Sequence, residues 1–112
     1  MGRQGFLGEF EQMVLLAVLQ LDDTAHGPSI SRELEGKAGR RVSRGALYSS
    51  LDRLEGKGFL RWKVEAATSD RGGHPRRCFQ VTEAGLEALR TSRQALTNLW
   101  AGLDRVFGER AG

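Results

Sequence analysis

The 112-residue sequence predicts a mainly helical fold with one small β-hairpin. Three observations support this fold class. Apolar residues recur at helical spacing in separate stretches, the pattern changes to strict alternation after residue 58, and adjacent glycines then separate two alternating segments. At this length we expect one small domain with an added helix, and the 39% hydrophobic content is adequate for a modest core.

The first two helices are predicted within residues 6–38. Residues 6–21 are dense in large apolar side chains, and Glu9 and Glu11 lie in the first turns, where their charge complements the helix dipole. The longest apolar run, residues 13–21, is far shorter than the roughly 20 residues of a membrane span, so we expect a buried helix and no membrane partner. Pro28 suits the first turn of a second, shorter helix.

The helix that organises the chain is predicted over residues 43–58, and both of its ends are marked. Ser43 can accept a hydrogen bond from a free backbone N–H, and Gly58 favours a left-handed C-terminal cap. One apolar stripe faces the core, formed by Leu47, Leu51 and Leu54. The opposite face is small and polar, which suits close entry into a DNA groove. With the shorter helix and the turn at 39–42 it predicts a helix-turn-helix, in which it is the recognition helix.

A β-hairpin is predicted after this helix. Residues 59–65 alternate, with Leu60, Trp62 and Val64 on the buried side of a half-buried strand. Residues 66–75 form the loop and residues 76–81 return as the partner strand. The hairpin is a basic wing, which either lies along the DNA backbone or is an ordinary exposed hairpin; its arginines are Arg71, Arg76 and Arg77.

The last helix begins at Thr82, a good N-cap residue, and carries a heptad stripe with one charged exception. The stripe consists of Leu86, Leu89, Arg93, Leu96, Trp100, Leu103 and Phe107. A domain this small cannot cover so long a stripe, so we expect it to pack against a second copy; the alternative is that it folds back on its own first helix. Trp100 either stacks on a flat aromatic ligand or packs as plain apolar surface.

Charge is distributed unevenly. Residues 37–77 carry eleven Lys and Arg against four Asp and Glu, whereas the rest of the chain has a net charge of −4. Such a patch attracts a polyanion, most commonly nucleic acid, although a solvated surface is the alternative. The lone Cys78 excludes an internal disulfide and fits a reducing interior, so we expect a cytoplasmic protein without a signal peptide.

No catalytic or metal-binding constellation is apparent. His74 and Cys78 offer two ligands where a structural zinc site needs four. His26, beside a helix start, is expected to be a capping or interface residue rather than a general base. The glycines match neither a Walker loop nor a dinucleotide fingerprint. We therefore expect no cofactor, no metal and no enzymatic activity.

Two blocks of the sequence resemble the PadR family of bacterial transcriptional regulators. After His26-Gly27 and a short helix, the first block is Val42-Ser43-x-Gly45-Ala46-Leu47-Tyr48-x-x-Leu51-x-Arg53-Leu54-Glu55-x-x-Gly58-x-Leu60. The second is Arg71-Gly72-Gly73-x-Pro75-Arg76-Arg77-x-Phe79-x-Val81-Thr82-x-x-Gly85. The family often has Tyr at the positions of His26 and Phe79. The resemblance implies a homodimeric winged-helix repressor, and the short C-terminal part resembles the compact branch, in which a single helix makes the dimer and small aromatic effectors bind between subunits.

The sequence thus predicts a winged helix-turn-helix over residues 6–82 and a dimerisation helix over residues 83–108. We expect a sequence-specific repressor that binds double-stranded DNA at an inverted repeat and is released by a small aromatic effector. The alternatives are a winged-helix protein-interaction module without DNA binding and a ligand-binding scaffold without regulatory output. The expected DNA-facing residues are Arg40, Arg41, Ser43, Arg44, Gly45, Tyr48, Ser49, Arg53, Arg71, Gly72, Arg76 and Arg77.

Overall fold

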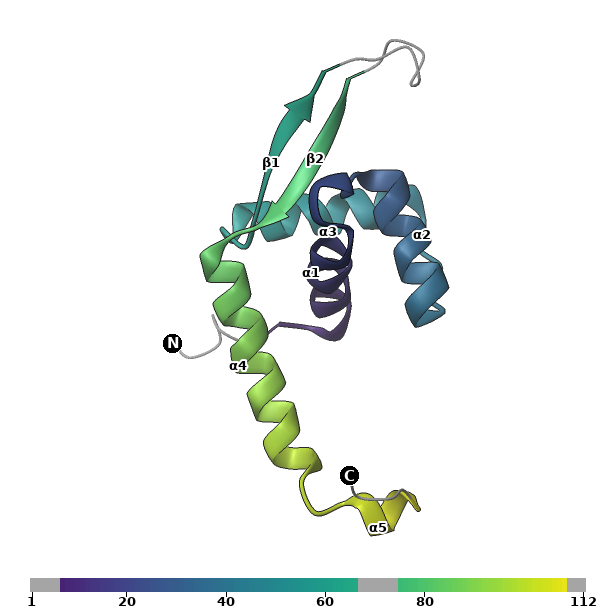
Figure 1. The fold of residues 1–112 in the computed structure, drawn as a ribbon, viewed down its shortest axis with the longest axis vertical. Coiled ribbons are helices and arrows are strands. Elements are labelled where there is room, and N and C mark those ends of the chain that lie inside the picture. The colour runs from purple at the N-terminus through teal and green to yellow at the C-terminus, as the bar shows by residue number, and fades with distance from the viewer. Residues whose placement is uncertain (1–6, 67–74, 109–112) are drawn as a thin grey trace.

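The computed structural model describes residues 7–66 and 75–108. In chain order its elements are α1 (Glu9–Leu21), the 3-10 turn η2 (Asp22–Thr24), α2 (Gly27–Ala38), α3 (Arg44–Gly56), β1 (Leu60–Glu65), β2 (Arg76–Val81), α4 (Glu83–Trp100) and α5 (Asp104–Phe107). Figure 1 shows α1 between α4 on one side and α2 on the other, with α3 crossing behind and the hairpin rising above. The mainly helical fold with one hairpin is as predicted.

The core lies where α1, α2 and α3 meet the base of the hairpin. Val14 and Leu15 of α1, Ile30 of α2 and Leu51 of α3 are each 0% exposed, and Phe79 of β2 closes the cluster. Buried residues recur at helical spacing on each helix, so the stripe that each helix presents inward matches the sequence pattern; they are Val14 and Val18, Ile30 and Leu34, and Leu47, Leu51 and Leu54. The shared core fixes α3 against the body and leaves its other face outside.

The helix-turn-helix has the caps that the sequence predicts. Pro28 lies in the first turn of α2, and Gly39 ends α2 with φ +63°. Ser43 caps α3, and Gly58 follows its end with φ +84°. The Gly58 N–H donates to the Glu55 carbonyl and the Phe59 N–H donates to the Leu54 carbonyl, a Schellman arrangement that satisfies the last carbonyls of α3. The chain then turns directly into β1.

The hairpin differs from the prediction in what it buries. Strands β1 and β2 pair antiparallel with Trp62 opposite Phe79, and the Phe79 N–H donates to the Ala25 carbonyl at 2.8 Å, which ties the hairpin base to the segment before α2. Leu60 is buried, but Trp62 is 38% and Val64 61% exposed. The predicted buried side is therefore wrong beyond Leu60, because the outer half of the hairpin projects past the core (Figure 1).

Helix α4 starts as predicted but ends early. Thr82 Oγ1 accepts a hydrogen bond from the Gly85 N–H at 3.0 Å. The predicted single helix through Phe107 is wrong: α4 ends at Trp100, Gly102 has φ +83°, and Leu103 and Phe107 belong to a turn and to the short α5. The left-handed glycine breaks the helical path, so the last two residues of the heptad stripe do not continue it.

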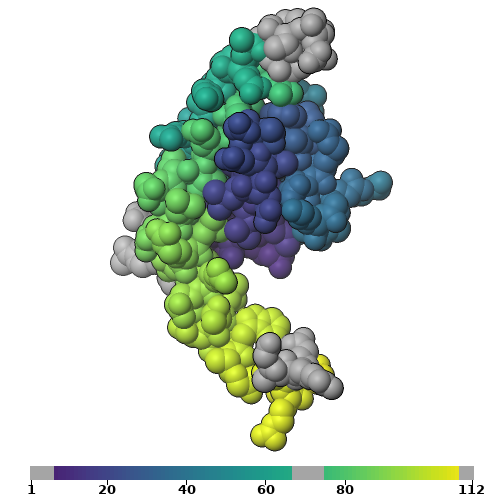
Figure 2. All heavy atoms as spheres, in the orientation of Figure 1, coloured from purple at the N-terminus to yellow at the C-terminus, as the bar shows by residue number. Residues whose placement is uncertain are grey.

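Only the first half of α4 packs on its own domain. Ala88, Leu89 and Ser92 are buried, and Ser92 Oγ accepts a hydrogen bond from the Leu7 N–H at 3.1 Å. Beyond Ser92 the helix leaves the body, and Figure 2 shows this segment and α5 standing out below the rest of the molecule. The alternative in which the whole stripe folds back on α1 therefore holds for the first half only.

Candidate nucleic-acid interface

Helix α3 has one buried and one exposed face, as predicted. Its three stripe leucines are each 2% exposed or less, and Ser43 Oγ accepts a hydrogen bond from the Ala46 N–H at 3.1 Å. A Cβ built on Gly45 would meet no atom within 4 Å, so the backbone there is open to an approaching ligand. The other exposed residues of this face are Arg44, Ser49, Asp52 and Arg53.

A large groove lies between the hairpin and the N-terminal ends of α2 and α3. We call it the wing groove; its volume is about 1130 Å³. It is lined by His26, Gly27, Pro28, Arg32, Arg44, Gly45, Tyr48, Trp62, Val64, Pro75, Arg76 and Arg77. Four of these residues are arginines and, among the described residues, no Asp or Glu lines the groove. The groove can therefore hold an anionic chain beside α3.

A second, smaller groove lies on the other side of α3. We call it the turn groove; its volume is about 470 Å³. Its lining residues are Phe10, Arg40, Arg41, Val42, Ser43, Ala46, Ser49, Ser50 and Arg53. The predicted DNA-facing residues that the structure describes are thus brought together around α3, but they divide between two grooves. Arg71 and Gly72 lie outside the described residues.

Tyr48 is half-buried, not freely exposed, because it packs over the start of α2. A Cβ on Gly27 would overlap the Tyr48 hydroxyl, so only glycine allows this close approach. The guanidinium of Arg44 lies 5.5 Å and that of Arg77 5.4 Å from the centroid of the Tyr48 ring. Tyr48 therefore joins α3 to both α2 and the hairpin.

Several predicted phosphate-binding arginines have carboxylate partners within the chain. The ion pairs are Arg40 with Glu9 at 3.8 Å, Arg41 with Glu35 at 3.2 Å, Arg76 with Glu65 at 2.8 Å and Arg77 with Asp52 at 3.4 Å. Arg53 donates to Ser50 Oγ at 3.3 Å. Arg32, which the sequence analysis did not single out, has no ion pair with a described residue. Its only signal in the sequence is its charge, since its place in the wing groove depends on how α2 packs.

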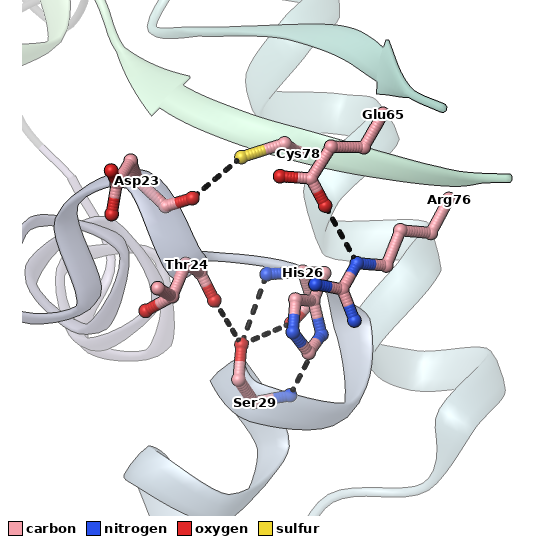
Figure 3. A network of polar contacts seen from close by, with 7 residues as sticks. All are labelled: Asp23, Thr24, His26, Ser29, Glu65, Arg76 and Cys78. Atoms are coloured by element: carbon pink, nitrogen blue, oxygen red, sulfur yellow. Dashed lines mark hydrogen bonds and ion pairs between the residues drawn. The ribbon is translucent and has the colours of Figure 1, made fainter. Parts of the chain in front are cut away.

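His26 is an N-cap residue, as predicted. Figure 3 shows it at the start of α2, near Arg76 and Glu65 of the hairpin. Its Nδ1 accepts a hydrogen bond from the Ser29 N–H at 3.4 Å, while Ser29 Oγ accepts one from the His26 N–H at 3.0 Å and donates to the Thr24 carbonyl at 2.7 Å. The Cys78 thiol, buried behind this corner, donates to the Asp23 carbonyl at 3.3 Å. These contacts fix the rim of the wing groove.

The C-terminal segment carries an apolar surface of its own. Leu96 is 47% and Trp100 53% exposed, Leu86 is half-buried, Leu89 is buried and Arg93 is exposed. With Leu16 and Leu19 of α1, these residues line a groove of about 370 Å³, which we call the α1/α4 groove. Beyond it, Phe107 packs its ring 5.1 Å from that of Trp100, and Leu103 is 38% exposed.

The described residues contain no group of three or more His, Cys, Asp or Glu arranged to hold a metal ion. Within the same part of the chain, no helix is long and apolar enough to cross a membrane.

The sequence matches the model of a known family along most of its length. The match, to the transcriptional regulator PadR-like family, covers residues 15–91, from α1 into α4. The chain is also 41% identical over 78 residues to the transcriptional regulator Rv3488 of Mycobacterium tuberculosis, an alignment that covers 70% of this chain and 68% of that protein.

Solved structures share the fold. A PadR family transcriptional regulator from Eggerthella lenta is 26% identical, with a TM-score of 0.66 over 88% of this chain and 86% of that one. A PadR-like transcriptional regulator from Bacillus cereus is 21% identical, with a TM-score of 0.71 over 90% and 93% of the two chains, and supports the fold alone. The family consists of transcriptional regulators with a winged-helix fold and not of enzymes. From α1 to the middle of α4, the chain belongs by sequence and by fold to the PadR-like family of transcriptional regulators.

Proposed function

We propose that the protein is a homodimeric repressor that binds an inverted-repeat operator and is released by a small aromatic effector. Residues 6–82 serve as the DNA-binding unit and residues 83–108 as the dimerisation segment. The observation that carries the proposal is the position of the exposed face of α3 between two arginine-lined grooves.

The two grooves suit the two strands of a DNA duplex. When a helix enters the major groove, a phosphate backbone passes along each of its sides. The wing groove would receive one backbone, with Arg32, Arg44 and Arg76, and the turn groove the other, with Arg40, Arg41 and Arg53. Base edges would then face Ser43, Gly45, Tyr48 and Ser49 at the start of α3.

The ion pairs of these arginines do not oppose this role. An exposed ion pair contributes only about 0–1 kcal/mol, so a phosphate can replace the carboxylate at little cost. Arg41, whose side chain is 87% exposed, can exchange Glu35 for a phosphate by rotamer changes alone. The carboxylate partners would hold the arginines near the DNA path when no DNA is bound.

The α1/α4 groove and the exposed apolar residues beyond it support a homodimer. Leu16, Leu19, Leu96 and Trp100 are each between 43% and 53% exposed, a contiguous apolar surface that a two-fold partner would cover. Two α3 helices would then contact successive major grooves, so half-sites about one helical turn apart, roughly 34 Å, are expected.

The same surface supports the effector part of the proposal. Trp100 lines the α1/α4 groove. A planar aromatic compound enclosed between two such grooves would stack on Trp100. If a compound stacks on Trp100, Trp100→Ala should abolish the quenching of indole emission that the compound causes in the parent. If Trp100 only packs as apolar surface, the compound should affect Trp62 emission equally in Trp100→Ala and in the parent.

Selection of bound sequences from a random DNA pool, combined with native mass measurement, tests the proposal. The expected result is an enriched inverted repeat and a mass of two chains on one operator. A monomer that enriches no sequence would overturn it and favour a protein-interaction module. Asp52 and Glu55 are exposed acidic residues of α3, and they favour that alternative.

A further inference from the structure

Arg77 of β2 is surrounded by aromatic rings from three elements. Its guanidinium carbon lies 5.4 Å from the ring centroid of Tyr48 on α3, 5.0 Å from that of Trp62 on β1 and 5.3 Å from that of Phe79 on β2. Its Nη1 also donates to Asp52 Oδ1 on α3 at 3.4 Å. Arg77 thus makes polar or stacking contacts with both strands of the wing and with the recognition helix.

Beyond Leu60, Arg77 is the described wing residue whose ion pair and ring contact both reach α3. Leu60, Cys78 and Phe79 bury only the base of the hairpin, and Trp62 and Val64 are already exposed. A two-stranded hairpin without a covered face is marginally stable in its orientation. The Arg77 cluster lies where the hairpin leaves the core, so its contacts set the angle between wing and α3.

We propose that Arg77 is a positioning residue, which clamps the wing to the recognition helix through its planar guanidinium and does not neutralise a phosphate. The inference rests on the proposed DNA-binding function and refines it, since the sequence analysis grouped Arg77 with the DNA-facing residues. Its side chain is only 30% exposed, and its charge already faces three rings and a carboxylate. By contrast, Arg44 on the same groove stacks on one ring and has no ion pair with a described residue.

Arginine and lysine differ in the property that this role needs. Both carry one positive charge, but only the guanidinium is planar and stacks on several rings at once. A phosphate contact would survive replacement by lysine as a point charge. Arg77→Lys therefore separates clamping from phosphate binding while the net charge stays constant.

Operator binding of Arg77→Lys and Arg77→Gln should be measured over a range of salt concentrations. We expect Arg77→Lys to weaken binding about five- to tenfold, and neither variant to change the slope of log K against log salt. Arg44→Gln, as the phosphate-contact reference, should lower that slope by about one unit. Arg61→Lys is the matched control, because Arg61 lies on β1 but pairs with Gln80 and does not line the wing groove.

A second readout follows the clamp without DNA. In a Trp100→Phe background Trp62 is the only indole, since the chain has two tryptophans. Loss of the guanidinium over its ring should raise acrylamide quenching of Trp62 in Arg77→Lys and not in Arg61→Lys. Circular dichroism melts confirm that each variant is folded.

A double-mutant cycle keeps the proposal falsifiable if one variant is poorly folded. If Arg77 acts through the stack, Arg77→Lys combined with Trp62→Leu should bind operator no more weakly than the weaker single variant. Full additivity would overturn the clamp, as would parent-like binding by Arg77→Lys or a slope lowered by about one unit in Arg77→Gln. If the parent bound no operator, the proposed function would fail, and the clamp would be judged by Trp62 quenching alone. Unchanged acrylamide quenching of Trp62 in Arg77→Lys would then overturn the clamp, and increased quenching would support it.

Discussion

Leu96→Glu tests the proposed dimer most directly. Leu96 is 47% exposed and lies on the α4 face that lines the α1/α4 groove. Fully burying a leucine side chain contributes about 1.5–3 kcal/mol, so covering the exposed half contributes about 1 kcal/mol in each protomer. A two-fold interface contains the residue twice, so losing this burial alone costs the dimer about 2 kcal/mol, roughly a 30-fold change in Kd.

Glutamate adds a further cost beyond the lost burial. Each protomer would bring a carboxylate into the seam, and taking a polar group from water without a partner costs about 1–3 kcal/mol by mutational data. The summed cost of about 4–8 kcal/mol raises the dimer Kd at least a thousandfold. Operator affinity should fall by about 10²- to 10⁴-fold, because the two half-site contacts are no longer linked.

Sedimentation velocity measures the first effect, and fluorescence anisotropy with labelled operator measures the second. Asn98→Glu is the matched control: it introduces the same charge two residues away, on the face where Gln94 Nε2 donates to Asn98 Oδ1 at 2.8 Å. The control should stay dimeric. A Leu96→Glu protein that sediments as a dimer at the concentrations where the parent does would refute the assignment of this surface.

Four other substitutions test separate parts of the structure. Gly45→Leu should weaken operator binding strongly while the melting temperature changes little, because the added side chain points into open space on the side of α3 that is proposed to face DNA. Parent-like binding would show that this face does not meet DNA. Gly85→Ala should lower the free energy of unfolding by about 1–3 kcal/mol, because the added Cβ would overlap the Phe59 carbonyl oxygen. Gly36→Ala has open space around the added Cβ and should raise the free energy of unfolding by about 0.5–1 kcal/mol. Equal effects of the two variants in denaturant titrations would contradict this packing. Burial alone would raise the pKa of Glu11, but its hydrogen bonds with Lys57 Nζ at 2.6 Å and with the Gly8 N–H outweigh burial and hold the pKa below its ordinary value of 4.5. The ionised form is therefore favoured in the fold, so Glu11→Gln should cost about 0.5–1 kcal/mol at pH 7, and the difference from the parent should disappear as the pH falls below 4.5, as followed by urea titration at several pH values.

Local features of the chain were predictable because their causes lie within a few residues. Ser43 and Thr82 cap helices through hydrogen bonds three residues away, and Gly39 and Gly58 end helices in left-handed conformations that L side chains avoid. Helical periodicity likewise identified the buried leucines of α3. The order of helices, turn and hairpin therefore follows from sequence, and so does the exposed face of α3.

Tertiary structure decided which residues of each pattern find a partner. The heptad stripe is continuous in sequence, yet only its first half meets α1, and the Gly102 turn removes Leu103 and Phe107 from the helix. Periodicity reports which face is apolar; it does not report where the body of the domain ends. The same limit applies to Trp62 and Val64: they lie on the apolar side of the alternating pattern, but they are exposed because the strand extends past the core.

The grooves beside α3 were also decided by packing across elements distant in sequence. Gly27 admits Tyr48 twenty-one positions later, and Arg77 meets Tyr48, Trp62 and Asp52 from two other elements. The sequence analysis grouped Arg77 with the residues expected to face DNA but could not show that three rings and a carboxylate already surround it. Capping and periodicity act over one or two helical turns, whereas stacking and ion pairing depend on side chains that only the folded chain brings together.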